Sequence, residues 1–288
     1  MVLNSKKLLS YWQLMRADRP IGTYLLAWPT IWALLIAADG FPPLGLFIIF
    51  MLGTFVMRSA GCVINDIADR NFDGHVTRTK HRPLATGAVT TKEALGLFVL
   101  LLVVALGLVL LLNISTIVLS IFAVAVAALY PFCKRWTHLP QVVLGVAFSF
   151  GIPMAFTAQN NDNYGVALLL VVANLLWTVA YDTEYAMADR DDDITVGIRS
   201  TALLFGRFDR LIIGLLQLLT LISLVAVGVV IESNWPYYGG LVVASALFAH
   251  QHWRIRKREA MACFRAFLDN HYVGMAIGVG LAISLLLD

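Results

Sequence analysis

Nine long apolar runs constrain the fold of this chain more than any other feature of its sequence. Each approaches the roughly 20 mostly apolar residues that a helix needs to cross a bilayer. They cover residues 20–38, 44–64, 94–112, 115–132, 140–158, 164–186, 211–231, 235–252 and 271–287. The uncharged stretch 94–132 must hold two helices, divided near Asn113, because a single helix of that length would overshoot a bilayer. The sequence therefore predicts an all-α integral membrane protein with nine transmembrane helices.

Composition agrees with this fold class. Hydrophobic residues make up 59% of the 288-residue chain and charged residues 14%, whereas soluble domains contain about 25% charged residues. The formal net charge of +3 is too small to indicate nucleic-acid binding. No linker-like segment or change of composition marks a boundary, so we expect a single membrane domain over residues 1–288.

Lysine and arginine residues are concentrated in alternate connections between the runs. They precede the first run and follow the second, fourth, sixth and eighth runs, whereas the other connections contain none. The positive-inside rule therefore predicts a cytoplasmic N-terminus and an external C-terminus. On this topology Cys62, Cys133 and Cys263 lie near the cytoplasmic face, where thiols stay reduced, so we expect no disulfide.

The segment before the first run is amphipathic. Leu8, Trp12 and Met15 fall at i, i+4 and i+7, which places them on one face of a helix. This segment is either a short helix in the membrane interface or an early start of the first transmembrane helix. No cleavage signature follows the first apolar run, so we expect the first helix to be retained.

Two acidic motifs stand at the ends of apolar runs. The first reads Asn-Asp-Ile-Ala-Asp-Arg-Asn-Phe-Asp from Asn65 to Asp73, and the second contains Asp182, Asp189 and Asp193. Both share the pattern Ala-Asp-Arg-x-x-Asp, and Asp69 and Asp189 are 120 residues apart. The repeat predicts two related halves of one fold. By the charge rule, both motifs face the cytoplasm.

The spacing of these carboxylates predicts a cation site. On a helix each set of three shares one face, where like charges repel one another. Mg²⁺ is commonly held by a few carboxylates together with the phosphates of a substrate. We therefore favour a metal and diphosphate site over solvated loop carboxylates. The predicted metal ligands are Asp66, Asp69, Asp73, Asp189 and Asp193, and Asn65 could add a neutral oxygen.

Basic residues near the motifs are candidates for binding phosphate. Arg70, Lys80, Arg82 and Arg135 either neutralise phosphate oxygens or simply reflect the positive-inside topology. Arg58 is different, because it is the one basic residue inside a predicted span and its permanent charge is costly there. It either forms an ion pair, with Asp66 or an acid on a neighbouring helix, or binds an anionic group of a substrate.

Longer strings around these residues resemble a known family. They are Met15-Arg-Ala-Asp-Arg-Pro-Ile-Gly22, Asn65-Asp-Ile-Ala-Asp-Arg-Asn-Phe-Asp73, Arg82-Pro-Leu, Tyr130-Pro-Phe-Cys-Lys-Arg-Trp-Thr-His-Leu-Pro140 and Tyr181-Asp-Thr-Glu-Tyr-Ala-Met-Ala-Asp-Arg-Asp-Asp-Asp193. The pair of Asp motifs resembles the UbiA-type membrane prenyltransferases. The flanking strings resemble the bacterial branch that prenylates 4-hydroxybenzoate in ubiquinone synthesis. The resemblance runs from about Tyr11 to the last helix.

This resemblance implies a fold, a reaction and a location. The fold is a nine-helix bundle around a central cavity, in the bacterial inner membrane, with the active site on the cytoplasmic side. The reaction transfers a polyprenyl chain from polyprenyl diphosphate to the ring carbon ortho to the hydroxyl of 4-hydroxybenzoate, with Mg²⁺ as cofactor. Substrates and membrane lipid are the implied partners, and nucleic acid is not among them.

The resemblance also implies roles for individual residues. The residues expected to act on the departing diphosphate are Asp69, Asp73, Asp189, Asp193 and Arg135. The residues expected to bind substrate are Asn65, Asp66, Asp182, Arg70 and Lys134 around the diphosphate, with Arg58 or Arg16 on the carboxylate of the acceptor.

Two alternative functions compete with this reading. The first is the same chemistry on another acceptor, such as a naphthoate, homogentisate or haem. The second is a cation-coupled transporter, but that class places its coordinating groups near the middle of the bilayer. The aspartates of this chain stand at helix ends, which favours the enzyme. Donor chain length and oligomeric state do not follow from the sequence.

Overall fold

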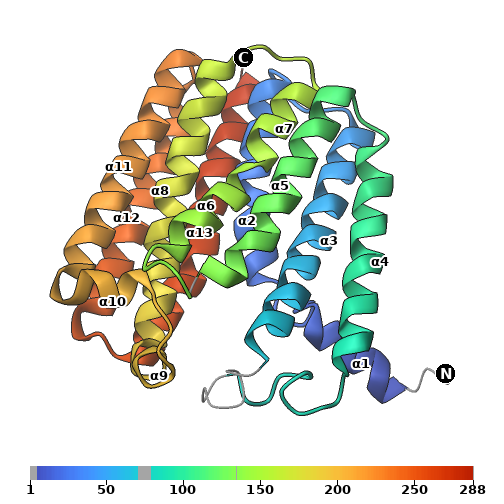
Figure 1. Ribbon diagram of the computed structural model, residues 1–288. Helices are drawn as coiled ribbons and strands as arrows, with labels where there is room; N and C mark the ends of the chain where they lie inside the picture. Colours follow the sequence, from blue (N-terminus) through green and yellow to red (C-terminus); the bar gives the residue numbers. More distant parts are fainter. Residues whose placement is uncertain (1–4, 71–78, 134, 288) are drawn as a thin grey trace.

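The computed structural model describes residues 5–70, 79–133 and 135–287. Their regular secondary structure is helical throughout (Figure 1). The helices are α1 (Ser5–Leu14), α2 (Ile21–Ala37), α3 (Leu44–Asp69), α4 (Thr91–Val109), α5 (Ile114–Cys133), α6 (Pro140–Ser149), α7 (Gly151–Ala158), α8 (Tyr164–Ala188), α9 (Arg190–Val196), α10 (Thr201–Phe205), η2 (Gly206–Phe208), α11 (Asp209–Val230), α12 (Trp235–Arg254), η3 (Ile255–Lys257) and α13 (Ala260–Leu287). The long helices run side by side, with α1, α9 and α10 at one end of the bundle.

The helices make this a membrane protein. Within the described residues, seven helical segments are long and apolar enough to cross a bilayer: 44–69, 91–109, 114–133, 140–158, 164–188, 201–230 and 260–287. Two long helices are not among these segments. Helix α2 has only 17 residues, and α12 carries the polar residues Gln251, His252 and Arg254 at its end. Each of the nine predicted runs nevertheless coincides with helical structure. Outward-facing apolar residues such as Ile114 and Val242 are 79% and 70% exposed, as a lipid-facing surface requires.

Two predicted boundaries were wrong, whereas the run 140–158 is confirmed as one candidate membrane span. Within this span the helix is interrupted between α6 and α7, near Pro153, which has no amide hydrogen to donate to the carbonyl of Ser149. Helix α13 begins at Ala260 rather than at residue 271, and α3 continues to Asp69 rather than ending at 64. In both cases the helix extends beyond its apolar part, which hydropathy alone does not detect. The predicted division near Asn113 is confirmed: its side chain accepts a 3.0 Å hydrogen bond from the amide of Thr116 in the first turn of α5.

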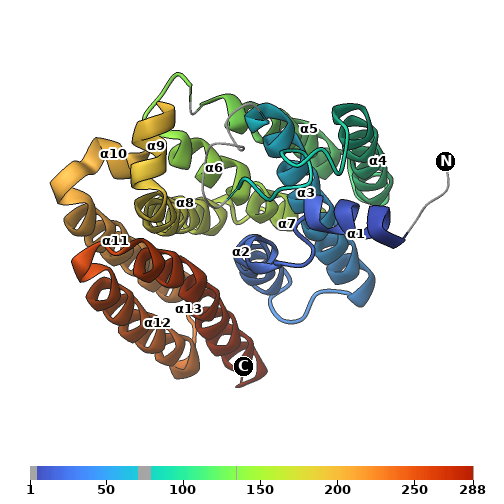
Figure 2. The same ribbon diagram turned by 90° about the horizontal axis from the view of Figure 1, so that it is seen from below.

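The N-terminal segment forms a short helix separate from α2. It is therefore not an early start of the first transmembrane helix. Arg16 has a positive φ of 56°, which interrupts the helical conformation between α1 and α2. Leu14 is fully buried and packs with Tyr11 and Met15 against residues of α3 and α4. Trp12, predicted to share a face with Met15, is 48% exposed. In the view along the bundle, α1 crosses beneath the ends of α3 and α4 (Figure 2).

The centre of the bundle joins α2, α8 and α13 through aromatic residues. The rings of Trp32 and Trp177 stack with centroids 5.5 Å apart. Each indole nitrogen has a hydrogen-bond partner on α13: Trp32 donates to the carbonyl of Gly274 and Trp177 to the side chain of Asn270. Both tryptophans are 1% exposed, so they are packing residues and not interface anchors. The three cysteines are buried and free, as predicted.

Candidate active site

A long cavity of about 870 Å³ lies inside the bundle, lined by residues of α1 to α9 and α13. Its two ends differ in chemistry. Phe50 and Asp66 both line it and lie sixteen residues apart on α3, which separates their levels by about 24 Å at 1.5 Å per residue. Carboxylates and arginines line the level of Asp66, whereas Phe50, Leu112 and Met154 line the far level. The cavity therefore combines a charged end with a long apolar body.

Both acidic motifs line the charged end of this cavity. Helix α3 contributes Asp66 and Asp69 from its last turn. Asp182 comes from α8, Asp189 from the junction of α8 and α9, and Asp193 from α9. Asp191 and Asp192 are not among the lining residues. The pairing of the motifs that the sequence predicted is thus a feature of the folded chain. Asp73 lies outside the described residues.

The second motif is not one continuous helix. Helix α8 ends at Ala188 and α9 begins at Arg190, so the motif does not form the continuous helix on which the predicted common face was based, although its three aspartates line one cavity. The amide of Asp193 still donates a 2.8 Å hydrogen bond to the carbonyl of Asp189. Gly197 ends α9 with a φ of 77°, a conformation that favours glycine. Asp193 still lines the cavity, although α8 and α9 are separate helices.

Asp66 is buried between two arginines. It is 1% exposed, and Nη2 of Arg16 lies 2.8 and 3.0 Å from its two carboxylate oxygens. Nη1 of Arg82 donates to Oδ1 of Asp66 at 3.0 Å. A buried carboxylate ion is stable only when it is paired in this way. The ion pairs hold both guanidinium groups at the charged end of the cavity, and metal binding by Asp66, which stays a prediction, would require Asp66 to release some of these contacts.

Asp69 and Asn65 form a second polar pair one turn apart on α3. Asp69 is 7% exposed, and Nδ2 of Asn65 donates to its Oδ2 at 3.2 Å. The other amide atom of Asn65, Oδ1, is buried and has no hydrogen-bond partner within the described residues. A buried carbonyl oxygen without a partner costs free energy unless a ligand satisfies it. The pair therefore presents a carboxylate and a neutral oxygen at the cavity, which is a donor set that suits Mg²⁺.

Arg135 and Arg70 lie beside the first motif and do not line the cavity. Nη2 of Arg135 donates to the carbonyl of Ala68 at 2.9 Å, and Nη1 of Arg70 donates to the carbonyl of Ile67 at 3.2 Å. Both side chains are exposed and satisfy carbonyl groups at the end of α3. Their predicted contact with diphosphate stays a prediction. Lys134 lies outside the described residues.

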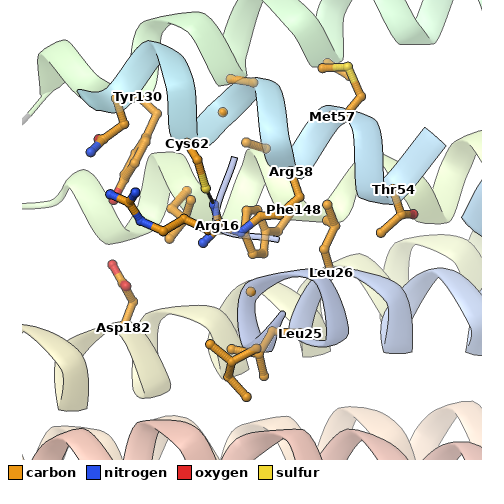
Figure 3. A pocket seen from close by; sticks show the side chains of 18 of the residues that line it. Arg16, Leu25, Leu26, Thr54, Met57, Arg58, Cys62, Tyr130, Phe148 and Asp182 are labelled. Atoms are coloured by element: carbon orange, nitrogen blue, oxygen red, sulfur yellow. Dashed lines mark hydrogen bonds between the residues drawn. The ribbon is translucent and has the colours of Figure 1, made fainter. Parts of the chain in front are cut away.

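Arg58 projects into the cavity from the middle of α3, near Tyr130 and Phe148 (Figure 3). It does not pair with Asp66, and within the described residues it has no carboxylate partner. Its Nη1 contacts the sulfur of Cys62, and its Nε is buried without a hydrogen-bond partner. The ion-pair alternative for Arg58 was therefore wrong. A charged group left in this state is suited to an anionic ligand.

Three further cavity residues did not enter the predicted site. His81, Tyr130 and Arg199 all line the cavity. Arg199 follows the second motif closely and donates from Nη1 to the carbonyl of Trp136 at 2.8 Å. Proximity to the second motif is the signal in the sequence that could have identified Arg199. His81 carries no metal-ligand spacing, so its place on the cavity follows only from the fold.

Comparison with known proteins places this chain in a family. Residues 26–277 match the pattern of the UbiA prenyltransferase family. The chain belongs to the UbiA prenyltransferase family. Within this family it is similar to a "4-hydroxybenzoate octaprenyltransferase" of Idiomarina loihiensis, with 64% identity over 96% of this chain and 98% of that protein.

Solved structures of UbiA homologues share the fold. The apo structure of a UbiA homologue from Aeropyrum pernix K1 superposes with a TM-score of 0.79 at 24% identity, covering 90% of this chain and 97% of that chain. A UbiA homologue from Archaeoglobus fulgidus bound to GPP and Mg²⁺ superposes with a TM-score of 0.73 at 16% identity, covering 97% and 100%. At these identities the likeness concerns the UbiA fold.

Proposed function

We propose that this protein transfers a polyprenyl chain from polyprenyl diphosphate to 4-hydroxybenzoate, at the ring carbon ortho to the hydroxyl, in a Mg²⁺-dependent step of ubiquinone biosynthesis. The observation that carries the proposal is the meeting of both Asp motifs at the charged end of one apolar cavity. The relative from I. loihiensis is named for this acceptor. The structure of the A. fulgidus homologue contains GPP and Mg²⁺ together.

Mg²⁺ fits the residues at the charged end. Within the described residues no group of three or more His, Cys, Asp or Glu side chains could hold a metal by itself. Mg²⁺ is usually bound by one or two carboxylates with water and substrate phosphates, so separate small clusters suit it better than a closed protein cage would. Asp69 and Asp189 with Asp66, Asp73 and Asp193 would hold the metal, and the unpaired oxygen of Asn65 would contribute to the first cluster.

The charged end also suits the diphosphate. Arg16, Arg82 and Arg199 line it, and Arg70 and Arg135 contact the end of α3 beside it. Lys134 is a further candidate from the sequence. When bound, Mg²⁺ would stabilise the charge that develops on the diphosphate as the allylic carbon–oxygen bond breaks. The guanidinium groups stabilise the same developing charge and orient the leaving group. Asp182 lies on α8 before the rest of its motif, on the side of the cavity where Arg16 and Tyr130 lie, and would contribute to binding the diphosphate.

The apolar body of the cavity serves the polyprenyl chain and the cation. Its walls include Gly53, Leu106, Val124 and Ala127 from three different helices. An allylic cation formed at the mouth of this body is shielded from water, which would otherwise quench it. The length of about 24 Å along α3 accommodates several isoprene units.

Arg58 is the better placed of the two predicted anchors for the acceptor carboxylate. Arg16 is already engaged with Asp66, whereas Nε of Arg58 is buried without a partner. An aromatic acid held by Arg58 would lie between Tyr130 and Phe148, between the apolar body and the aspartates. Attack of its ring carbon on the cation and loss of a ring proton would complete the transfer.

The membrane topology belongs to the same proposal. A single domain over residues 1–288 with nine spans, arranged in two related halves, is supported by the helical structure at each predicted run and by the two motifs at corresponding helix ends. Helix α1 and the last turn of α13 lie at opposite ends of the bundle. We place the N-terminus and the active site on the cytoplasmic side of a bacterial inner membrane because the basic connections lie at that end.

An assay with purified protein tests the proposal. The full chain in lipid nanodiscs is given polyprenyl diphosphate, radiolabelled 4-hydroxybenzoate and Mg²⁺, and the prenylated acid is quantified. Parallel reactions contain a naphthoate, homogentisate or haem as acceptor. Product from 4-hydroxybenzoate at the highest kcat/KM supports the proposal. A higher kcat/KM with another acceptor would show that 4-hydroxybenzoate is not the preferred acceptor. Absence of product with all of the acceptors would reject the proposed prenyl transfer.

A further inference from the structure

Asp209 is a fully buried carboxylate that does not line the cavity. It begins α11, and both of its oxygens accept hydrogen bonds from charged groups. Nη2 of Arg190 donates to Oδ2, Nη2 of Arg258 donates to Oδ1 at 2.8 Å, and Nε of Arg258 lies 3.1 and 3.0 Å from the two oxygens. The amide of Arg210 donates to Oδ1 at 2.6 Å. One carboxylate thus holds two arginines from distant parts of the chain.

Arg190 belongs to the second Asp motif. It is the first residue of α9, directly after Asp189 and three residues before Asp193. Helix α9 has seven residues and none of them is buried, so apolar packing does not hold it in place. Arg190 supplies a polar anchor instead, because Nη2 also donates to the carbonyl of Ala202 in α10 at 3.0 Å. The side chain of Arg190 therefore connects the motif to a buried part of the bundle.

Arg258 fixes the other side of the carboxylate. It lies in the turn between η3 and α13 with a φ of 55°, and its Nη2 also donates to the carbonyl of Arg207 at 3.0 Å. Removing one member of such a buried cluster leaves an uncompensated charge, so the cluster resists rearrangement. The motif turn, the start of α11 and the turn before α13 are held together at this point.

We propose that Asp209 is a positioning residue for the second Asp motif: it fixes Arg190, and through Arg190 it keeps Asp189 and Asp193 turned toward the cavity. The inference rests on the proposed function, in which these two aspartates bind a divalent metal with the diphosphate. It assigns a role to a side chain that touches neither substrate nor metal.

Two variants test this role, and each is compared with a matched control. Asp209→Asn weakens the whole cluster, whereas Arg190→Gln removes only the link to α9 and leaves the pair of Asp209 with Arg258. The control is Asp269→Asn, which breaks the 3.2 Å ion pair of Asp269 with Arg254 between α12 and α13 without involving either motif. All are full-length proteins in nanodiscs.

The first readout is metal binding without turnover. Mn²⁺ binding is measured by the loss of the free-ion electron paramagnetic resonance signal in the presence of inorganic pyrophosphate. We expect at least a fivefold weaker Mn²⁺ affinity in Asp209→Asn and Arg190→Gln, and an affinity within twofold of wild type in the control. The second readout is hydrogen exchange of residues 190–196 in metal-free protein, which we expect to become at least tenfold faster in both variants.

The kinetic pattern separates positioning from general stability. The Mg²⁺ concentration for half-maximal activity and the KM for the diphosphate donor should rise at least fivefold, while the KM for the acceptor stays within twofold. If Arg190→Gln binds Mn²⁺ as wild type does and α9 exchanges at the wild-type rate, the inference is overturned, even if Asp209→Asn fails to fold. If Asp189→Ala keeps wild-type activity, the proposed function itself fails. If Asp189→Ala is inactive while Arg190→Gln behaves as wild type in Mn²⁺ binding and hydrogen exchange, only the positioning role of Asp209 is rejected and the proposed function stands.

Discussion

Arg16 and Asp66, fifty residues apart in the chain, form a buried ion pair in which Nη2 of the arginine contacts both carboxylate oxygens at 2.8 and 3.0 Å. The pair attaches the turn after α1 to the last turns of α3. Arg82 completes it from the connection that precedes α4. The charged end of the cavity is therefore closed on one side by ion pairs whose members are themselves candidate ligands for substrate and metal.

Neutralising Asp66 should disturb both stability and donor binding. In Asp66→Asn, Arg16 and Arg82 lose their shared anion, and we expect a loss of about 1–3 kcal/mol in the free energy of unfolding. The KM for the diphosphate donor should change at the same time, because both arginines line the cavity. Thermal unfolding in nanodiscs and steady-state kinetics measure the two effects. Lys6→Gln, an exposed change on α1, is the control, and equal behaviour of the two variants would contradict the role of Asp66.

Asp69→Ala and Asp189→Ala should each lower kcat at least about 100-fold, because each removes a ligand that would bring the metal to the leaving group. Membrane insertion and expression should be unchanged. Asp191→Asn is the matched control, since Asp191 lies in the same acidic stretch but is exposed and does not line the cavity. Activity near wild type in either alanine variant would reject the metal assignment.

Arg58→Ala should raise the KM for the acceptor about 10-fold or more, the effect expected for loss of a charged hydrogen bond in a buried site. The KM for the donor should change little, because Arg58 precedes Asp66 by eight residues on α3, about 12 Å along the helix axis. Met57→Leu, a neighbouring cavity residue changed without altering charge, serves as control. An unchanged acceptor KM in Arg58→Ala would leave Arg16 as the remaining candidate for that contact.

Chelation should stop the reaction reversibly. We expect EDTA to abolish product formation and excess Mg²⁺ to restore it, because the described carboxylates form separate clusters that need substrate phosphates to complete the coordination. Product formation is followed before and after each addition. Full activity in EDTA-treated and dialysed protein would show that the step needs no divalent metal.

Narrowing the apolar body should discriminate between donors by length. Ala127 lines the cavity from α5, and Ala127→Phe would fill space that a long polyprenyl chain uses. We expect a higher KM for long polyprenyl diphosphates and an unchanged KM for geranyl diphosphate. Ala125→Phe, at an exposed position of the same helix, is the control. An equal effect on both donors would place the polyprenyl chain elsewhere.

The sequence alone determined the fold class and the two acidic motifs, because both depend on local composition. Apolar runs of bilayer length leave the backbone no alternative to helix, and charge-rich strings at their ends are visible without any structure. The repeated pattern suggested a relation between Asp69 and Asp189, and both residues line the same cavity. Helix ends at Asp69 and Ala260 were missed, because a helix continues beyond its apolar part where tertiary contacts cover it.

Only the tertiary structure decided which charges meet. Arg58 and Asp66 are eight residues apart and share a face of one helix, about 12 Å apart along its axis. Arg16 and Arg82 approach from other segments and pair with Asp66 instead. The buried cluster at Asp209 likewise joins three connections that are distant in the chain. Spacing within a helix predicts which residues share a face, whereas ion pairing depends on which segments the packed bundle brings together, and desolvation makes those pairings selective.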